Sequence, residues 1–172
     1  MKIKGLLIGI LMTLTLGTIT SYAADDWEVY FYYDGESVLM PVGTSSNEGV
    51  YHPGMRGSLI STAISRISNI GGGDIEISLE TQAHVDVDEI RQQAYLDQWD
   101  EKTQDWYTVD MYSDVAYGKD YPNGLGSLKS TFVIHGQKTG YYYRARGMHK
   151  VTKSGQGSQT FSSRTDGVLI TK

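Results

Sequence analysis

Apolar and polar residues alternate most strictly between residues 75 and 83. One set of positions contains Ile75, Ile77, Leu79, Thr81 and Ala83, and the intervening set contains Glu76, Ser78, Glu80 and Gln82. A period of two is typical of an antiparallel strand with one face in water and the other against a core. The run Gly71-Gly72-Gly73-Asp74 predicts a turn immediately before it. We therefore expect a half-buried strand that begins at a tight turn.

A less regular alternation predicts a hairpin between residues 90 and 112. Even-numbered positions from Ile90 to Leu96 share one face, and odd-numbered positions from Arg91 to Asp97 share the other. Trp99 and Trp106 flank the polar sequence Asp100-Glu101-Lys102-Thr103-Gln104-Asp105, which we expect to reverse the chain into a second strand over 106–112. The next residues, 113–126, include a Tyr-Pro-Asn-Gly turn at 121–124 and are predicted to be irregular. Further strands are predicted over 129–135, 141–151 and 160–170.

The segment 59–69 is compatible with two structures. The spacing of Ile60, Ala63, Ile64 and Ile67 fits one face of a short amphipathic helix. Serine, threonine and β-branched isoleucine are mediocre helix formers, however, and they make up most of this segment. We favour a strand here, with the helix as the alternative.

The sequence Gly-Tyr-Tyr-Tyr-Arg-Ala-Arg-Gly-Met-His-Lys at 140–150 gathers aromatic and basic residues. In a strand, Tyr141, Tyr143 and Ala145 point to one side, and Tyr142, Arg144 and Arg146 point to the other. We expect the first set to lie in the core, with one tyrosine hydroxyl bonded to the backbone as in the tyrosine corners of β-sandwiches. The second set is expected to face solvent.

About seven short strands separated by turn signals predict an all-β fold, an immunoglobulin-like antiparallel β-sandwich, with a small barrel as the alternative. We expect this domain to span residues 58–172. Residues 24–57 are predicted to be an N-terminal arm and linker, because the alternating Trp27, Val29, Phe31 and Tyr33 give way to a Gly- and Ser-rich stretch. Whether residues 24–57 pack on the sandwich is left open.

Residues 1–23 have the pattern of a secretory signal peptide. Lys2 and Lys4 precede an uncharged, apolar run, and small residues end it at Ala23. The alternative, a membrane anchor, needs an apolar run of roughly 20 residues, which is longer than this one. We therefore expect a secreted protein that is soluble outside the cytoplasm, with no membrane insertion after cleavage.

Cysteine is absent, and acidic residues outnumber basic ones. Small exported domains often depend on disulfides, so this domain must be stable through packing alone. The formal net charge of the whole chain is −5, and loss of Lys2 and Lys4 with the signal peptide makes it −7. Nucleic acids and anionic membrane surfaces attract basic proteins, so we expect neither as a partner.

Several short runs resemble an uncharacterised family of small secreted proteins of low-GC Gram-positive bacteria, a domain of unknown function. The runs lie at 72–78, 95–96, 106–109, 140–144, 147–149 and 165–168, and the most specific is Tyr-Tyr-Arg-x-Arg-Gly-x-His at 142–149. The resemblance covers about residues 56–170. It implies secretion and an all-β domain, and it implies no catalytic residue.

Candidate chemistry is sparse in this sequence. The histidines, His52, His84, His135 and His149, do not have the short spacings of zinc ligands. Asp86, Asp88 and Glu89 are the best calcium candidates, but no glycine follows for the turn of a calcium loop, so we favour a solvated turn and leave calcium binding open. No cofactor is expected. The motifs of common hydrolases are lacking, which makes a small secreted hydrolase the least favoured function.

The favoured function is a secreted, non-catalytic binding module for an extracellular glycan or protein. Its predicted binding residues are Tyr142, Arg144, Arg146 and Trp99, because exposed aromatic rings and arginines can stack on sugars or anchor a partner. The alternative is an extracellular structural or interaction protein that assembles through the strand predicted at 27–33. The identity of the ligand or partner and the oligomeric state are left open.

Overall fold

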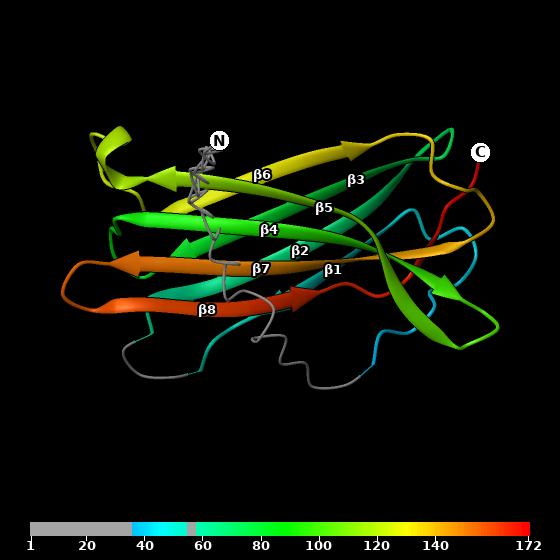
Figure 1. Ribbon diagram of the computed structural model, residues 1–172, viewed down its shortest axis with the longest axis horizontal. Helices are drawn as coiled ribbons and strands as arrows, with labels where there is room; N and C mark the ends of the chain where they lie inside the picture. Colours follow the sequence, from blue (N-terminus) through cyan, green and yellow to red (C-terminus); the bar gives the residue numbers. More distant parts are fainter. Residues whose placement is uncertain (1–35, 55–57) are drawn as a thin grey trace, which may run out of the picture.

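The computed structural model describes residues 36–54 and 58–172 of the chain (Figure 1). They form two antiparallel sheets packed against each other, which confirms the prediction of an all-β sandwich. One sheet has the strand order β1-β2-β3-β6, and the other has the order β5-β4-β7-β8, with β9 also paired to β7. The elements are β1 (Ser46–Tyr51), β2 (Ile60–Gly71), β3 (Asp74–Ala83), β4 (Glu89–Asp100), β5 (Asp105–Tyr117), the 3₁₀ helix η2 (Gly118–Asp120), β6 (Ser127–Ile134), β7 (Tyr142–Lys153), β8 (Gly157–Arg164) and β9 (Val168–Leu169).

Three connections pass from one sheet to the other. They join β3 to β4, β5 to β6, and β6 to β7, whereas the hairpins β2–β3, β4–β5 and β7–β8 each stay within one sheet. The edge strand β1 comes from the stretch predicted to be arm and linker, and it pairs with β2 from Ser46↔Ser68 to Tyr51↔Ala63. Within the described ranges, no helix is long and apolar enough to span a bilayer.

Most of the predicted strands are confirmed. β3 buries Ile75, Ile77 and Leu79 completely, as the alternation along that segment predicts. A strand, not a helix, forms over most of the ambiguous segment, because β2 pairs along its length with β3 and buries Ile60, Ala63 and Ile67.

Two predictions about the extent of strands are wrong. β5 does not end at residue 112 but continues to Tyr117, because β4 provides a partner for each further residue up to the pair Glu89↔Tyr117. Aspartate is depleted in strands, and at Asp114 the pairing with β4 overrides that preference. The strand predicted over 160–170 is divided, since β8 ends at Arg164 and β9 begins at Val168.

A belt of polar side chains crosses the core between two apolar clusters. The clusters are centred on Leu79 and Leu96 on one side and on Ile60 and Ile90 on the other. Each strand from β2 to β8 contributes one belt residue: Ser65, Thr81, Gln92, Asp114, Ser130, His149 and Ser163. All of them except Asp114 are buried. The predicted alternation of β4 therefore placed Gln92 on the correct face, where it is buried together with the apolar residues.

Hydrogen bonds run continuously through this belt. His149 Nδ1 and Nε2 lie 2.8 Å from Thr81 Oγ1 and 2.8 Å from Ser163 Oγ, respectively, and Ser163 Oγ is 2.6 Å from Ser65 Oγ. On the other side, Gln92 Nε2 donates to Thr81 Oγ1 at 2.8 Å. Ser130 Oγ lies 2.6 Å from Gln92 Oε1 and 2.7 Å from a carboxylate oxygen of Asp114. The buried polar groups thus find partners within the fold, which removes most of the cost of burying them.

Gly147 makes room for the belt. A Cβ atom at this position would lie 2.5 Å from Ser65 Oγ and 2.7 Å from His149 Nε2, both closer than such atoms approach in proteins. Any larger residue would therefore push β2 away from β7, and glycine is required here for close packing of the two sheets.

The tyrosine corner expected after Gly140 is formed by Tyr143. Its side chain is fully buried, and its hydroxyl lies 3.2 Å from the carbonyl oxygen of Lys138 and 3.1 Å from Gln98 Oε1. Burial raises the pKa of Tyr143 to about 12. Ala145 is also buried as predicted, but Tyr141 is 44% exposed, so the prediction that it belongs to the core is wrong. Tyr141 precedes the first residue of β7, and strand alternation does not constrain its side chain.

Replacing the corner tyrosine tests how much these bonds contribute. Tyr143→Phe keeps the ring and removes the hydroxyl, so we expect the free energy of unfolding to fall by about 1–2 kcal/mol. Equilibrium denaturation in urea measures this change. Tyr141→Phe is the control, and we expect it to leave the free energy of unfolding within about 0.5 kcal/mol of the wild type. Equal effects of the two substitutions would contradict a structural role for the corner.

The buried histidine predicts a pH dependence of stability. Complete burial lowers the pKa of His149 to about 3, so the folded state keeps the ring neutral, whereas an unfolded histidine titrates near pH 6.5. The stabilisation is fully present above about pH 6.5 and is lost as the pH falls toward 3, by about 1.4 kcal/mol per pH unit, because the unfolded state binds the extra proton.

Substitution of this histidine should remove that slope. We expect His149→Gln to be less stable near neutral pH but to lose less stability than the wild type between about pH 6 and pH 4.5. Urea denaturation over this range measures both slopes. His135→Gln is the matched control, because the side chain of His135 is 74% exposed and the wild-type slope should persist. A slope in His149→Gln as steep as that of the wild type would rule out this origin.

Candidate functional site

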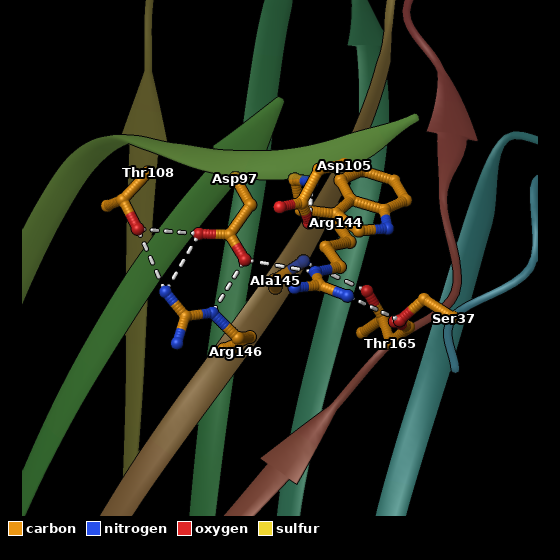
Figure 2. A network of polar contacts seen from close by, with 9 residues as sticks. Ser37, Asp97, Asp105, Thr108, Arg144, Ala145, Arg146 and Thr165 are labelled. Atoms are coloured by element: carbon orange, nitrogen blue, oxygen red, sulfur yellow. Dashed lines mark hydrogen bonds and ion pairs between the residues drawn. The ribbon is translucent and has the colours of Figure 1, made fainter. Parts of the chain in front are cut away.

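Asp97 lies at the centre of an ion cluster on the outer face of the β5-β4-β7-β8 sheet (Figure 2). One carboxylate oxygen accepts a hydrogen bond from Arg144 Nε at 2.9 Å and another from Arg146 Nε at 2.6 Å. The other oxygen accepts from Arg146 Nη2 at 3.0 Å and from Thr108 Oγ1 at 2.8 Å. The side chain of Asp97 is only 1% exposed, and those of Arg144 and Arg146 are 12% and 14% exposed.

Strand register brings these residues together. Asp97 on β4 is the direct partner of Arg144 on β7, and Arg146 is the partner of the neighbouring outward residue, Tyr95. On the other side, a bulge after Leu96 shifts the pairing so that Asp97 lies opposite Thr108 on β5. Three strands therefore meet at one carboxylate.

The two arginines keep Asp97 ionised. Burial alone would raise its pKa, but hydrogen bonds and charge from Arg146, together with those from Arg144, lower it below the ordinary value of 3.8. A buried carboxylate is costly unless it is both paired and hydrogen-bonded, and this one accepts four bonds.

Aromatic rings connect the ion cluster to the end of the β4–β5 hairpin. The guanidinium of Arg144 lies 4.6 Å from the ring centre of Trp106, which is within the range of a cation–π contact. Trp106 in turn packs against Trp99, with ring centres 5.2 Å apart and planes tilted by 59°. The guanidinium of the second arginine, Arg146, lies 4.9 Å from the ring centre of Tyr95.

Part of the predicted N-terminal arm also packs on this cluster. Arg144 Nη1 donates to Ser37 Oγ at 3.2 Å, and Ser37 Oγ donates to the carbonyl oxygen of Thr165 at 2.8 Å. Backbone hydrogen bonds from Gly167 N to Val38 O, 2.8 Å, and from Met40 N to Gly167 O, 2.9 Å, continue this contact in parallel. The strand predicted at 27–33 lies outside the described residues.

An open pocket of about 310 Å³ lies at the end of the sandwich, beside the β4–β5 turn. Residues of β4, β5, the β4–β5 turn and the β6–β7 loop line it: Gln98, Trp99, Asp100, Glu101, Lys102, Tyr107, Lys138 and Tyr141. Three aromatic rings, two ammonium groups and two carboxylates thus surround one opening. Such a mixture can stack on a flat apolar surface and hydrogen-bond to polar groups around it.

The predicted binding residues are distributed over three environments. Trp99 lines the pocket, whereas Arg144 and Arg146 are engaged by Asp97 in the ion cluster. Tyr142 is half-buried at the start of β7, paired with Leu169 and outside the pocket lining. The polar hairpin between two tryptophans was the sequence signal for Trp99. The lysines Lys102 and Lys138 were missed, because only the fold brings their two loops together.

The tyrosine corner supports the same pocket. Both acceptors of the Tyr143 hydroxyl, Gln98 Oε1 and the carbonyl oxygen of Lys138, belong to pocket-lining residues. One buried hydroxyl therefore joins β4 to the β6–β7 loop behind the pocket.

The acidic segment proposed for calcium connects β3 to β4. Hydrogen bonds from the side chain and from the backbone N–H of Ser154, the latter at 2.5 Å from a carboxylate oxygen, lower the pKa of Asp88. A Cβ at Gly124 would lie within 2.4 Å of the carboxylate atoms of Asp86. In the part of the chain that the structure describes, no three acidic or histidine side chains gather as a metal site would require.

Comparisons of the sequence with models of known protein families and with curated proteins gave no match. The function must therefore be argued from the site itself.

Loss of the buried Asp97 carboxylate should destabilise the fold far more than loss of a surface carboxylate. Asp97→Asn leaves two largely buried guanidinium groups without a counter-charge, so we expect the free energy of unfolding to fall by about 3–5 kcal/mol. Glu48→Gln is the control, since the side chains of Glu48 and Arg66 are 37% and 50% exposed and such surface pairs contribute at most about 1 kcal/mol. Urea denaturation of both variants measures the difference. A loss at Asp97 no larger than at Glu48 would contradict the assignment.

Proposed function

We propose that the protein is a secreted, non-catalytic binding module that holds an extracellular glycan in the pocket at the β4–β5 hairpin. The observation that carries this proposal is the convergence of Trp99, Tyr107 and Tyr141 on one opening beside Lys102 and Lys138. The C–H face of a sugar ring packs on an aromatic ring, and its hydroxyl groups bond to charged and amide side chains around the rim.

The rigidity of the pocket wall supports this proposal. Trp99 packs on Trp106, which contacts Arg144, and Arg144 is bound to the buried Asp97. Tyr143 joins the opposite wall through Gln98 and Lys138. A site whose side chains are already ordered loses less conformational entropy when it binds a ligand. In this proposal Trp99 contacts the ligand, and Arg144 and Arg146 hold the wall in place.

Export and the finer fold class belong to the same proposal. The charged start, apolar run and small residues before position 24 support secretion. The tyrosine corner at the start of β7 and the three connections between sheets support an immunoglobulin-like sandwich.

Glycan-array binding tests the site. We expect Trp99→Ala and Tyr107→Ala each to weaken binding of the retained glycans by about 30-fold, the effect of losing a contact of about 2 kcal/mol. Tyr117→Ala and Tyr121→Ala are controls, because these rings are 39% and 41% exposed, much as Tyr107 is at 44%. Tyr117 ends β5 and Tyr121 follows η2, and Figure 1 shows η2 and this end of β5 at the opposite end of the sandwich from the β4–β5 hairpin. Both control variants should bind as the wild type does.

Two outcomes would contradict the proposal. One is that the wild type binds no glycan on arrays of bacterial and host origin. The other is that the pocket and control substitutions weaken binding equally. Circular dichroism and thermal melting of each variant separate a lost contact from a lost fold.

A further inference from the structure

Among the residues that the structure describes, no strand pairs with one long side of β5. It is the outermost strand of the β5-β4-β7-β8 sheet, 13 residues in length, and Figure 1 shows it at the margin of that layer. Several of its apolar side chains are between 38% and 54% exposed: Tyr107, Val109, Met111, Val115 and Tyr117. A long edge strand with exposed apolar residues is a template for the addition of another strand, unless something blocks its backbone.

Three aspartates on β5 bond to the backbone of their own strand. Asp105 Oδ1 accepts from Trp106 N at 2.7 Å, Asp110 Oδ1 from Met111 N at 2.9 Å, and Asp114 Oδ1 from Val115 N at 2.8 Å. In each case the carboxylate of one residue caps the N–H of the next. The same arrangement occurs near the beginning, the middle and the end of one strand.

The positions of these caps agree with the geometry of an edge. Successive N–H groups of a strand point to opposite sides, so the groups of Met111 and Val115, four residues apart, point the same way. Trp106 is an odd number of residues from Met111, so simple alternation would turn its N–H to the opposite side. The bulge between β4 and β5 leaves Val109 without a partner, however, and this extra residue brings the N–H of Trp106 back to the same side as that of Met111. All three capped N–H groups therefore point to the same side of β5. The N–H of Gly118, which has the opposite parity to Met111 and Val115, donates to Asp88 O beside β4 at 2.8 Å, so the capped groups point away from β4.

Two of the caps are themselves held in place. The second oxygen of Asp110 accepts from the Tyr112 hydroxyl at 2.7 Å, and this bond raises the pKa of Tyr112 to about 12. The second oxygen of Asp114 accepts from Ser130 Oγ at 2.7 Å, at the end of the polar belt. Both carboxylates are thus oriented before any partner approaches.

We propose that Asp105, Asp110 and Asp114 close the free edge of β5 against addition of a strand, above all the β5 strand of a second copy of this chain. An incoming strand must form hydrogen bonds with the outward N–H groups, and three of these already donate to charged acceptors, which bind more strongly than neutral carbonyls. The incoming carbonyl oxygens would also lie beside the displaced carboxylates. Two antiparallel copies of β5 would bring six carboxylates together.

Removing the caps should open the edge. The test compares Asp105→Ala/Asp110→Ala/Asp114→Ala with the same triple change to asparagine, because asparagine keeps the acceptor oxygen without the charge. Size-exclusion chromatography with light scattering, over a range of concentrations, measures self-association. We expect the alanine variant to associate at least tenfold more strongly than the wild type. The asparagine variant should lie between the two, because it keeps a neutral acceptor for each N–H but loses the charge repulsion.

The substitution Ser113→Pro tests whether the new self-association occurs through the edge of β5. The N–H of Ser113 lies two residues from those of Met111 and Val115, so it points the same way, and proline lacks this donor. Adding Ser113→Pro to the alanine variant should abolish the new association. Asp120→Ala, just beyond β5 in η2, is the control for loss of a neighbouring carboxylate that caps no N–H of β5, and it should not associate more than the wild type.

Several results would overturn the proposal. They are an alanine variant that associates no more than the wild type, an asparagine variant that associates as strongly as alanine, and an association that persists with Ser113→Pro. Thermal melting shows whether the variants are folded. If loss of the Asp114 bond to Ser130 unfolds the triple variant, Asp105→Ala/Asp110→Ala keeps that bond and must show the same association.

Discussion

A single buried carboxylate, that of Asp97, organises the end of the sandwich that carries the β4–β5 hairpin. It binds two arginines of β7 and a threonine of β5, so three neighbouring strands share one charge centre. The segment before β1 reaches the same centre through Ser37, and Trp106 rests on one of the arginines. Because the carboxylate is only 1% exposed and its hydrogen-bond donors come from two neighbouring strands, these contacts favour one arrangement of the hairpin end. The pocket is built on that arrangement.

The polar belt imposes a second constraint, on register. Each strand from β2 to β8 places one polar side chain at the same level of the core, with apolar residues on both sides of it. A slip of two residues in any strand would keep the correct face but would place a polar group among apolar ones and leave its partner unsatisfied. Buried networks of this kind cost much when only partly satisfied, so they favour one alignment of the sheets over its near alternatives. Gly147 is part of the same constraint, since only glycine leaves space beside His149 and Ser65.

Local alternation in the sequence explains the elements that were predicted correctly. β3 and most of β4 and β7 bury one face, and a period of two follows directly from that geometry. The end of β5 was missed because Ser113 and Asp114 have low strand propensity, and the pairing that compensates for it comes from β4, some twenty residues earlier. The arginines of β7 were placed on the correct face, but the prediction that Arg144 and Arg146 face solvent is wrong, since their side chains are only 12% and 14% exposed. Their partner, Asp97, is 47 and 49 residues away in sequence.

By itself, the sequence determined the all-β class, the direction in which most strand side chains point, and the tyrosine corner, because each depends on neighbours a few residues apart. Only the tertiary structure decided which polar residues are buried, that Arg144 and Arg146 bind Asp97 while Trp99 faces a pocket, and that the aspartates of β5 cap an exposed edge. The physical reason is that charge pairing, burial and edge position depend on which strands become neighbours. That order is set by packing of the whole chain, and no local pattern encodes it.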